Sequence, residues 1–239
     1  MHFESGSIER INILFEECKR NFITKLQDTT EKRALIESFE LQVDSKINEY
    51  GGHFDKCIIS IGKPSEPIDE AALRGLMYHE IAHGHFHYEP KGYKTWNELV
   101  PTQELSQPED TVNLLNLTSN ILLDLDILYR CNMKLEFGED TLAWVNKEFE
   151  VFRSHLNSSM PKREIYINAI IYGTRLHLFC QEERITELTK YFKDNEEQLL
   201  WLAYGIEMSA RFPFKFLKNQ KEGVTEWVKE FITDTQNAR

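Results

Sequence analysis

Two histidines and a glutamate lie within five residues of one another, at a spacing that suits metal chemistry. They form an HExxH motif in which His79 and His83 flank Glu80. On a helix, residues four apart lie on the same face, so the two imidazoles can bind one Zn²⁺. Glu80 could then reach a water on that metal and act as a general base. The motif therefore predicts a zinc site with hydrolytic chemistry.

The residues around the motif predict how it is positioned. The β-branched run at 57–61 predicts a strand, which either packs in the core or serves as an edge strand that pairs with an extended substrate. Asp69 predicts the N-cap of the next helix, with Ile68 and Leu73 as a hydrophobic staple. Gly84 indicates either a close approach of backbone or substrate, or the start of the helix end.

Two further histidines, His85 and His87, follow the motif. His87 lies four residues after His83, so it could line the cleft or contact substrate. A polar, partly exposed helix end is the alternative. Phe86 and Glu89 stand where the metzincin motif HExxHxxGxxH requires glycine and histidine, which excludes that family.

A zinc site needs a third protein ligand, with a fourth position left for water. Capping residues at 106–109 and a Leu- and Ile-rich run predict a helix that ends near Asn132. Along it, polar residues recur every three or four positions and form one stripe, namely Asn113, Asn116, Asn120 and Asp124. We interpret Asp124 as the third ligand and Asn120, one turn earlier, as a donor that orients it.

The polar stripe also fits roles outside a metal site, and a different carboxylate could be the third ligand. Asp124 could belong to a solvated face or contact the N-terminal part. Asp126 has Arg130 four residues later, and we interpret it as a surface ion pair. Asp126 nevertheless stays an alternative third ligand, as do the carboxylates near the irregular stretch at 88–107, which are Glu98, Glu104 and Glu109.

The two motifs together resemble the zincin superfamily. The HExxH motif, followed by Asn120-x-x-x-Asp124-x-x-Ile127, is most similar to the metallopeptidase domains associated with von Willebrand A modules. That resemblance implies zinc ligation by His79, His83 and Asp124, with Glu80 as the general base. Leu128 departs from the asparagine often found in that family, and no von Willebrand A module fits in this chain. The histidine helix also resembles that of the ImmA/IrrE-type peptidases, whose third ligand lies sooner after the histidines.

The remaining apolar periodicity predicts mostly helices. Two packed helices are expected over 8–26 and 35–50, and four more over 142–156, 165–179, 195–210 and 223–236. We therefore expect a predominantly helical α+β fold, with a zincin-like core and small sheet in 1–135 and a helical lobe in 136–239, packed as one compact unit. Tyr172, Arg175 and His177 could supply an electrophile for an oxyanion, or simply pack or face solvent.

The composition limits the classes of partner and the cellular compartment that we expect. The net charge of −11 argues against a nucleic-acid partner, and the widely scattered cysteines fit reduced thiols in the cytoplasm. The sequence contains neither a secretory signal pattern nor an apolar run long enough to span a membrane. The aromatic, basic strip at 212–218 could dock a protein partner, or could be a helix end packed on the core.

These features predict a zinc-dependent metallopeptidase that hydrolyses peptide bonds in a protein or peptide substrate. Two alternatives remain open. The chain could be a catalytically inactive zincin-fold interaction or regulatory module, or a metal-dependent hydrolase of a non-peptide substrate.

Overall fold

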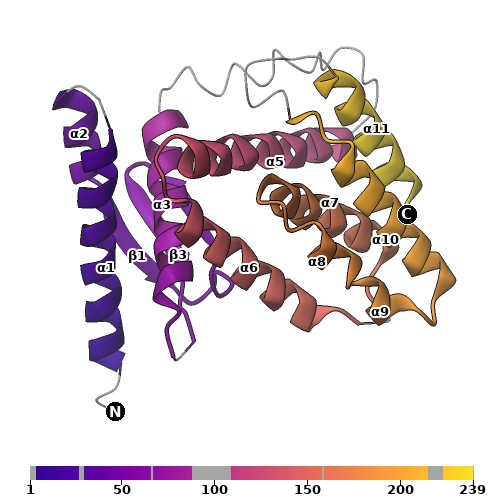
Figure 1. Cartoon of the computed structure of the whole chain (residues 1–239), viewed down its shortest axis with the longest axis horizontal. Helices are drawn as coiled ribbons and strands as arrows, with labels where there is room; N and C mark the ends of the chain where they lie inside the picture. The colour runs from indigo at the N-terminus through magenta and orange to yellow at the C-terminus, as the bar shows by residue number, and fades with distance from the viewer. Residues whose placement is uncertain are drawn as a thin grey trace. The chain divides into compact units, whose positions relative to one another are not determined.

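The fold is α+β and mostly helical, with one small sheet (Figure 1). The computed structural model describes residues 4–26, 30–65, 67–87, 109–157, 159–214 and 223–238. The first elements are α1 (Glu4–Lys25), α2 (Thr30–Glu37), β1 (Glu40–Asp44), β2 (Gly52–Asp55), β3 (Ile58–Gly62) and α3 (Glu70–His87). The later ones are α5 (Glu109–Met133), α6 (Gly138–His155), α7 (Lys162–Leu178), α8 (Glu183–Thr186), α9 (Thr189–Phe192), α10 (Glu196–Ala210) and α11 (Val224–Asn237).

The chain divides into two compact units. The first comprises Met1–Pro90 and Ile127–Val151, and the second Lys91–Asp126 and Phe152–Arg239. The division falls inside α5, so this one continuous helix contributes residues to both. The predicted boundary after residue 135 stays a prediction. Within the described ranges, no helix is both long and apolar enough to cross a membrane.

The sheet of the first unit has the strand order β1-β3-β2. β3 pairs with β1 in parallel and with β2 antiparallel, so that Ser60 lies opposite both Gln42 and His53. The predicted strand at 57–61 is thus confirmed as β3. It is central, however, and buries Ile59 and Ile61 completely. The alternative of a core strand is therefore confirmed, and the alternative of an edge strand is wrong, because β1 and β2 pair with β3 on its two sides.

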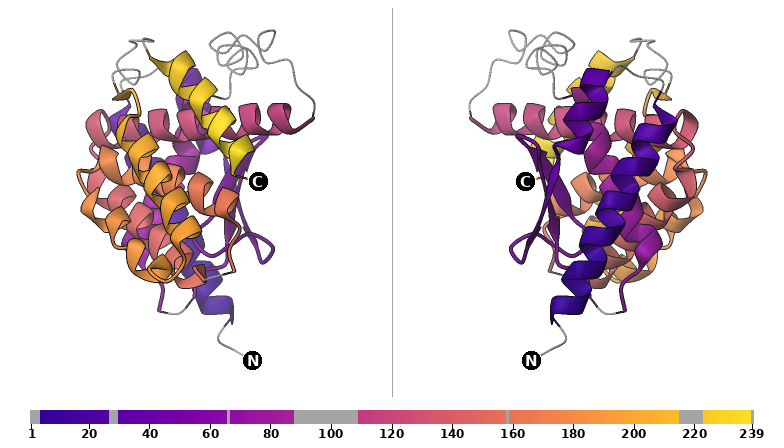
Figure 2. Two further views of the ribbon diagram at one scale, coloured as in Figure 1. Left: turned by 90° about the vertical axis from the view of Figure 1, so that its right-hand side faces the viewer. Right: turned by 90° about the vertical axis from the view of Figure 1, so that its left-hand side faces the viewer.

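The prediction of an N-terminal pair of helices is only partly correct. α1 matches the prediction and packs along α3, as Figure 2 shows in its right-hand view. The second helix, predicted to reach residue 50, ends at Glu37 and is followed by β1. Apolar residues at Phe39, Leu41 and Val43 also alternate with polar ones, as a strand requires. Main-chain pairing with β3 favours the strand at this position.

Asp69 accounts for the start of α3, and Gly84 accounts for its close packing near the other end. The Asp69 carboxylate accepts a hydrogen bond from the Ala72 N–H at 3.1 Å, which confirms the predicted N-cap. α3 continues through Gly84, which is therefore not the helix end. A Cβ at Gly84 would lie 2.5 Å from the Phe39 ring and 2.6 Å from the Phe54 ring. The glycine thus lets two aromatic rings of the sheet region reach the helix backbone.

The second unit is built on the pairing of α7 with α10 (Figures 1 and 2). Glycines make this crossing close, because a Cβ at Gly205 would lie 2.6 Å from Ala169 Cβ and one at Gly173 would lie 2.3 Å from Ser209 Oγ. α11 adds the buried Trp227 to the same unit. The four helices predicted for the C-terminal half are confirmed as α6, α7, α10 and α11.

The four thiols should differ sharply in reactivity. Cys180 is exposed, Cys57 is half-buried, and Cys18 and Cys131 are buried. Burial raises the pKa of Cys18 to about 12, and only the thiolate reacts with alkylating agents. We expect iodoacetamide at pH 8 to modify Cys180 on the order of 100-fold faster than Cys18. Timed mass spectrometry measures both rates.

A Cys180→Ser variant should remove the fast phase of this labelling, and guanidinium should equalise the remaining thiols. Fast labelling of Cys18 in the folded protein would contradict the close packing of α1 around this thiol.

Candidate metal centre

His79 and His83 face each other on consecutive turns of α3. Their Nε2 atoms lie 3.0 Å apart, and their rings meet edge to face. Two nitrogens bound to a tetrahedral zinc ion at about 2.1 Å would be about 3.4 Å apart, so a small ring rotation would admit the ion. His79 is only 3% exposed, whereas His83 is half-buried. One ligand is thus embedded in the core and the other lies nearer to its boundary.

Trp144 of α6 supports the buried histidine. Its ring centroid lies 4.5 Å from that of His79. This contact requires α6 to come very close to α3, and Gly75 allows it. A Cβ at Gly75 would lie 2.0 Å from the Asp140 carbonyl oxygen and 2.8 Å from Trp144 Cβ. The glycine one turn before His79 therefore allows Trp144 to pack against this histidine.

Tyr50 fixes both Trp144 and the start of α3. Its carbonyl accepts a hydrogen bond from the Trp144 indole N–H at 2.8 Å, and its hydroxyl accepts one from the Asp69 N–H at 3.1 Å. Tyr50 is buried and has a positive φ of 58°, a region that bulky residues rarely adopt. One strained, buried residue thus ties the helix N-cap to the indole that supports His79.

Glu80 lies between the two histidines in sequence and beneath β2 in space. Its side chain is buried, at 4% exposure. A Cβ at Gly52, the first residue of β2, would lie 3.0 Å from Glu80 Oε1 and 3.0 Å from Leu76 Cδ1. The absence of a side chain at Gly52 gives the carboxylate its space, so the edge strand and the candidate base are in direct contact.

The last turns of α5 approach α3 next to the first histidine. The Cys131 thiol lies 3.9 Å from the carbonyl oxygen of Tyr78, the residue before His79. The Tyr78 ring stacks on Phe137 with centroids 3.8 Å apart, and burial raises the pKa of Tyr78 to about 12. Asp124 lies seven residues before Cys131, which places it on the same face of α5, two turns away.

The three predicted ligands form one group of possible metal-binding side chains. Ligand atoms of His79, His83 and Asp124 all lie within 4.8 Å of one another. Two imidazoles and one carboxylate are a donor set that zinc accepts, so these side chains could hold a metal ion. Asp124 is half-buried, and one of its oxygens accepts a hydrogen bond from Arg175 of α7 at 2.7 Å.

The other polar residues of α5 divide into two groups. Asn113, Asn116 and Asn120 are exposed, so a solvated face accounts for them. Asn120 nevertheless lines the same small cavity as Asp124, and its orienting role stays a prediction. Asp126 is buried, at 9% exposure, so the predicted surface position is wrong, while its ion pair with Arg130 stays a prediction. The Arg130 guanidinium lies over the Phe86 ring, 4.8 Å from its centroid.

The other described candidate residues contact aromatic rings. His85 is buried and packs edge to face against Phe22, with centroids 5.8 Å apart. Tyr172 stacks on Phe152, and the His177 ring lies 6.4 Å from that of Phe214. Their roles toward an oxyanion stay predictions. The side chains of His87, Glu98, Glu104 and Glu109 lie outside the described residues, as does most of the strip at 212–218.

Comparison with known proteins does not assign this chain to a family. No family model matches the chain, and neither a curated protein nor a solved structure matches it significantly. The resemblance to zincins therefore stays a prediction, and a metal centre is inferred from the geometry of these side chains alone.

Sequence reasoning missed two supports of the centre. Trp144 falls within the helix predicted over 142–156 without being singled out, and Tyr50 is the last residue of the helix predicted over 35–50, which ends at Glu37 instead. Neither carries a local motif, because their contacts join residues 94 positions apart in the chain. The close crossing at Gly75 had a weak signal, namely a glycine inside a helical pattern, which often marks tight packing.

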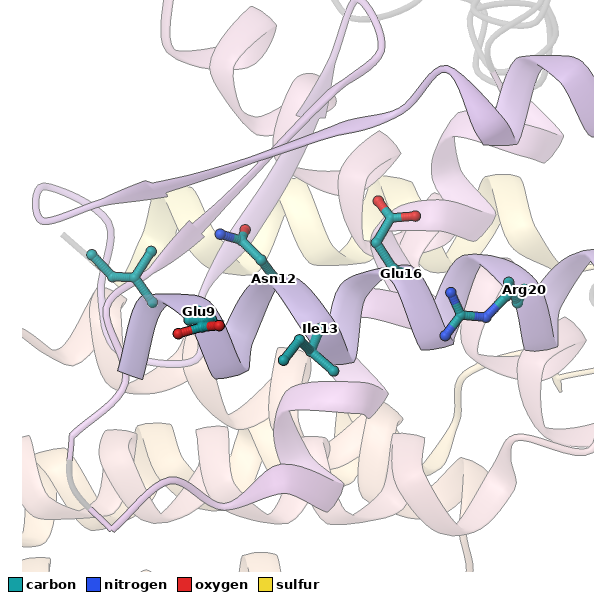
Figure 3. Close-up of a pocket in the computed structure, with 6 residues that line it drawn as sticks. Glu9, Asn12, Ile13, Glu16 and Arg20 are labelled. Atoms are coloured by element: carbon teal, nitrogen blue, oxygen red, sulfur yellow. The ribbon is translucent and has the colours of Figure 1, made fainter. Parts of the chain in front are cut away.

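A groove elsewhere in the described part of the chain is not lined by a group of histidines and carboxylates like that of the candidate metal centre. This groove along the outer face of α1 is lined by residues of that helix alone (Figure 3), namely Ile8, Glu9, Asn12, Ile13, Glu16 and Arg20. Ile8 and Ile13 are 45% and 44% exposed. The groove lacks residues converging from a second element, which ligand sites usually have.

We expect Gly75→Ala to destabilise the protein. In an open helix this change stabilises by about 0.5–1 kcal/mol, because alanine loses less entropy on folding than glycine. Here the new methyl would meet the Asp140 carbonyl, and overpacking of this kind costs about 1–3 kcal/mol. Urea unfolding measures the change. A stabilised Gly75→Ala protein would show that α3 and α6 do not cross closely at this position.

Proposed function

We propose that this protein is a zinc-dependent metallopeptidase. The observation that carries the proposal is that ligand atoms of His79, His83 and Asp124 lie within 4.8 Å of one another, with the buried Glu80 next to His79 in the sequence. Two histidines and a carboxylate leave a coordination position for water in a tetrahedral site, which is the pattern of catalytic rather than structural zinc. A bound zinc ion would supply Lewis acidity and lower the pKa of a coordinated water towards about 7.

Each protein group has a distinct task in this proposal. His79, His83 and Asp124 bind the ion, and Trp144 and Tyr50 hold His79 in place. Glu80 accepts a proton from the attacking water and passes it to the leaving amine. Because the Glu80 side chain is 4% exposed, bulk water competes little with that transfer.

The sheet suggests how an extended peptide would bind. β2 lies at one edge of the described sheet, and its first residue, Gly52, contacts Glu80. A peptide added as a further strand beside β2 would form main-chain hydrogen bonds irrespective of its sequence. Its backbone would then run past the candidate base. This arrangement favours a peptide over a compact small molecule as the substrate.

Replacement of Glu80 by Gln should abolish hydrolysis and leave zinc in place. The amide keeps the shape of the side chain and cannot accept the proton, so we expect a loss of at least about 10²–10⁴-fold. Cleavage of a fluorogenic peptide library measures activity, and plasma mass spectrometry measures zinc per chain.

The matched variants are His79→Ala and Asp124→Ala, which should lose activity and bind zinc much more weakly than the wild type. Full activity of Glu80→Gln would refute the mechanism. Iron instead of zinc in the purified protein would refute the choice of metal, since two histidines and a carboxylate also suit non-haem iron. Zinc without cleavage of any peptide would favour an inactive module.

The contact between Gly52 and Glu80 provides a second test. In Gly52→Ala the new methyl would displace the end of the Glu80 side chain, so hydrolysis should fall while the zinc content is unchanged. Gly51→Ala is the matched control, because its methyl would face Asn48 and Ile47 instead. Peptide cleavage and zinc content are measured for both. Equal rates would show that β2 does not position the base.

A further inference from the structure

We propose that Arg175 is a positioning residue, which holds Asp124 in the orientation needed to bind the metal. The inference depends on the proposed function, because it assigns Asp124 to the metal. It concerns a different residue, on a different helix, and it can fail while the metal site stands.

The pair between Arg175 and Asp124 is close and sheltered. Arg175 donates to the Asp124 carboxylate with a nitrogen-to-oxygen distance of 2.7 Å. The side chains of Arg175 and Asp124 are 10% and 25% exposed. By comparison, the ion pair between Arg211 and Glu230 in the same unit has side chains that are 49% and 42% exposed. Water therefore weakens the pair at Asp124 less than a typical surface pair.

The backbone that carries Arg175 is firmly held. The preceding residue, Thr174, is completely buried, and its hydroxyl donates to the Ile170 carbonyl at 2.8 Å. One position earlier, Gly173 packs directly against Ser209 of α10. A guanidinium on such an anchored turn has few alternative positions. It can therefore fix the carboxylate rather than follow it.

A small cavity beside this carboxylate gives it room to change orientation. A cavity of about 60 Å³ is lined by Asp124, Arg175, Asn120 and Thr174 on its polar side. Ile121 and Ile171 form part of its apolar side. The space suits a few water molecules at most, so it is not a substrate pocket. Without the guanidinium, the Asp124 side chain could rotate into this space.

Two effects of Arg175 on the metal oppose each other. Its positive charge repels a cation, while its hydrogen bond restricts the ligand to one orientation. We infer that orientation dominates, because partners that orient metal ligands typically improve metal affinity by about 10–100-fold. Arg175 also balances the charge of Asp124 when the metal is absent, which keeps the ligand in place for binding.

The test measures zinc affinity by chelator competition in wild-type protein and in Arg175→Met. We expect zinc binding to weaken by about 10–100-fold. In cobalt-loaded protein, the visible absorption bands should shift, because they report the ligand geometry directly. Arg211→Met, which breaks a surface ion pair by the same substitution, should change zinc affinity less than about twofold.

A double-mutant cycle separates positioning from general damage. If Arg175 acts through Asp124, then Arg175→Met should weaken zinc binding by less than about twofold when Asp124 is already Ala. Arg175→Lys keeps the charge but not the planar guanidinium, so it should also weaken zinc binding. If Arg175→Met does not fold, the Lys variant carries the test.

The outcomes distinguish the two proposals. Wild-type protein that binds no zinc would overturn the proposed function. Zinc binding by wild-type protein, with equal or higher affinity and unchanged cobalt spectra in the Arg175 variants, would overturn the positioning role alone.

Discussion

The burial of polar side chains on α3 is the constraint on which the rest of the first unit depends. His79 and Glu80 are almost completely buried on adjacent positions of one helix. Polar groups removed from water destabilise a fold unless other groups compensate for the lost hydration. The packing around them is correspondingly specific. Trp144 covers His79, Gly52 leaves space for Glu80, and neither arrangement would be needed if leucine occupied these positions.

Glycine makes this packing possible. Gly75 admits α6, Gly84 admits the aromatic rings of the sheet region, and Gly52 admits the Glu80 carboxylate. All three lie within a few residues of the site in sequence or in contact with it. A side chain at any of them would separate α3 from a neighbour. The site is therefore positioned mainly by close backbone approach, with Tyr50 and Trp144 adding hydrogen bonds between distant segments.

The helices and the side chains that could hold a metal ion were predictable because their signals are local. The HExxH spacing, the Asp69 cap and the apolar stripes of α6, α7, α10 and α11 all act within a few residues. The prediction failed where distant residues decide the outcome. Residues 39–43 have both helical and strand periodicity, and only pairing with β3 selects the strand. Asp126 has an arginine at helical spacing, but its burial depends on tertiary packing that no local pattern reveals.

In the proposed metal site, Arg175 illustrates how a residue with no motif can contribute. Its sequence neighbours form an ordinary packed helix, and its connection to the centre spans 51 positions, from α7 to Asp124 on α5. A carboxylate ligand has two oxygens and a rotatable bond, so its position in the absence of metal is not fixed by its own helix. A buried guanidinium on a rigid turn removes that freedom. Histidine ligands need less help of this kind, because adjacent turns of α3 and the indole of Trp144 already restrict their rings. In the proposed site, the carboxylate is thus the ligand for which we expect an external positioning group to have the largest effect.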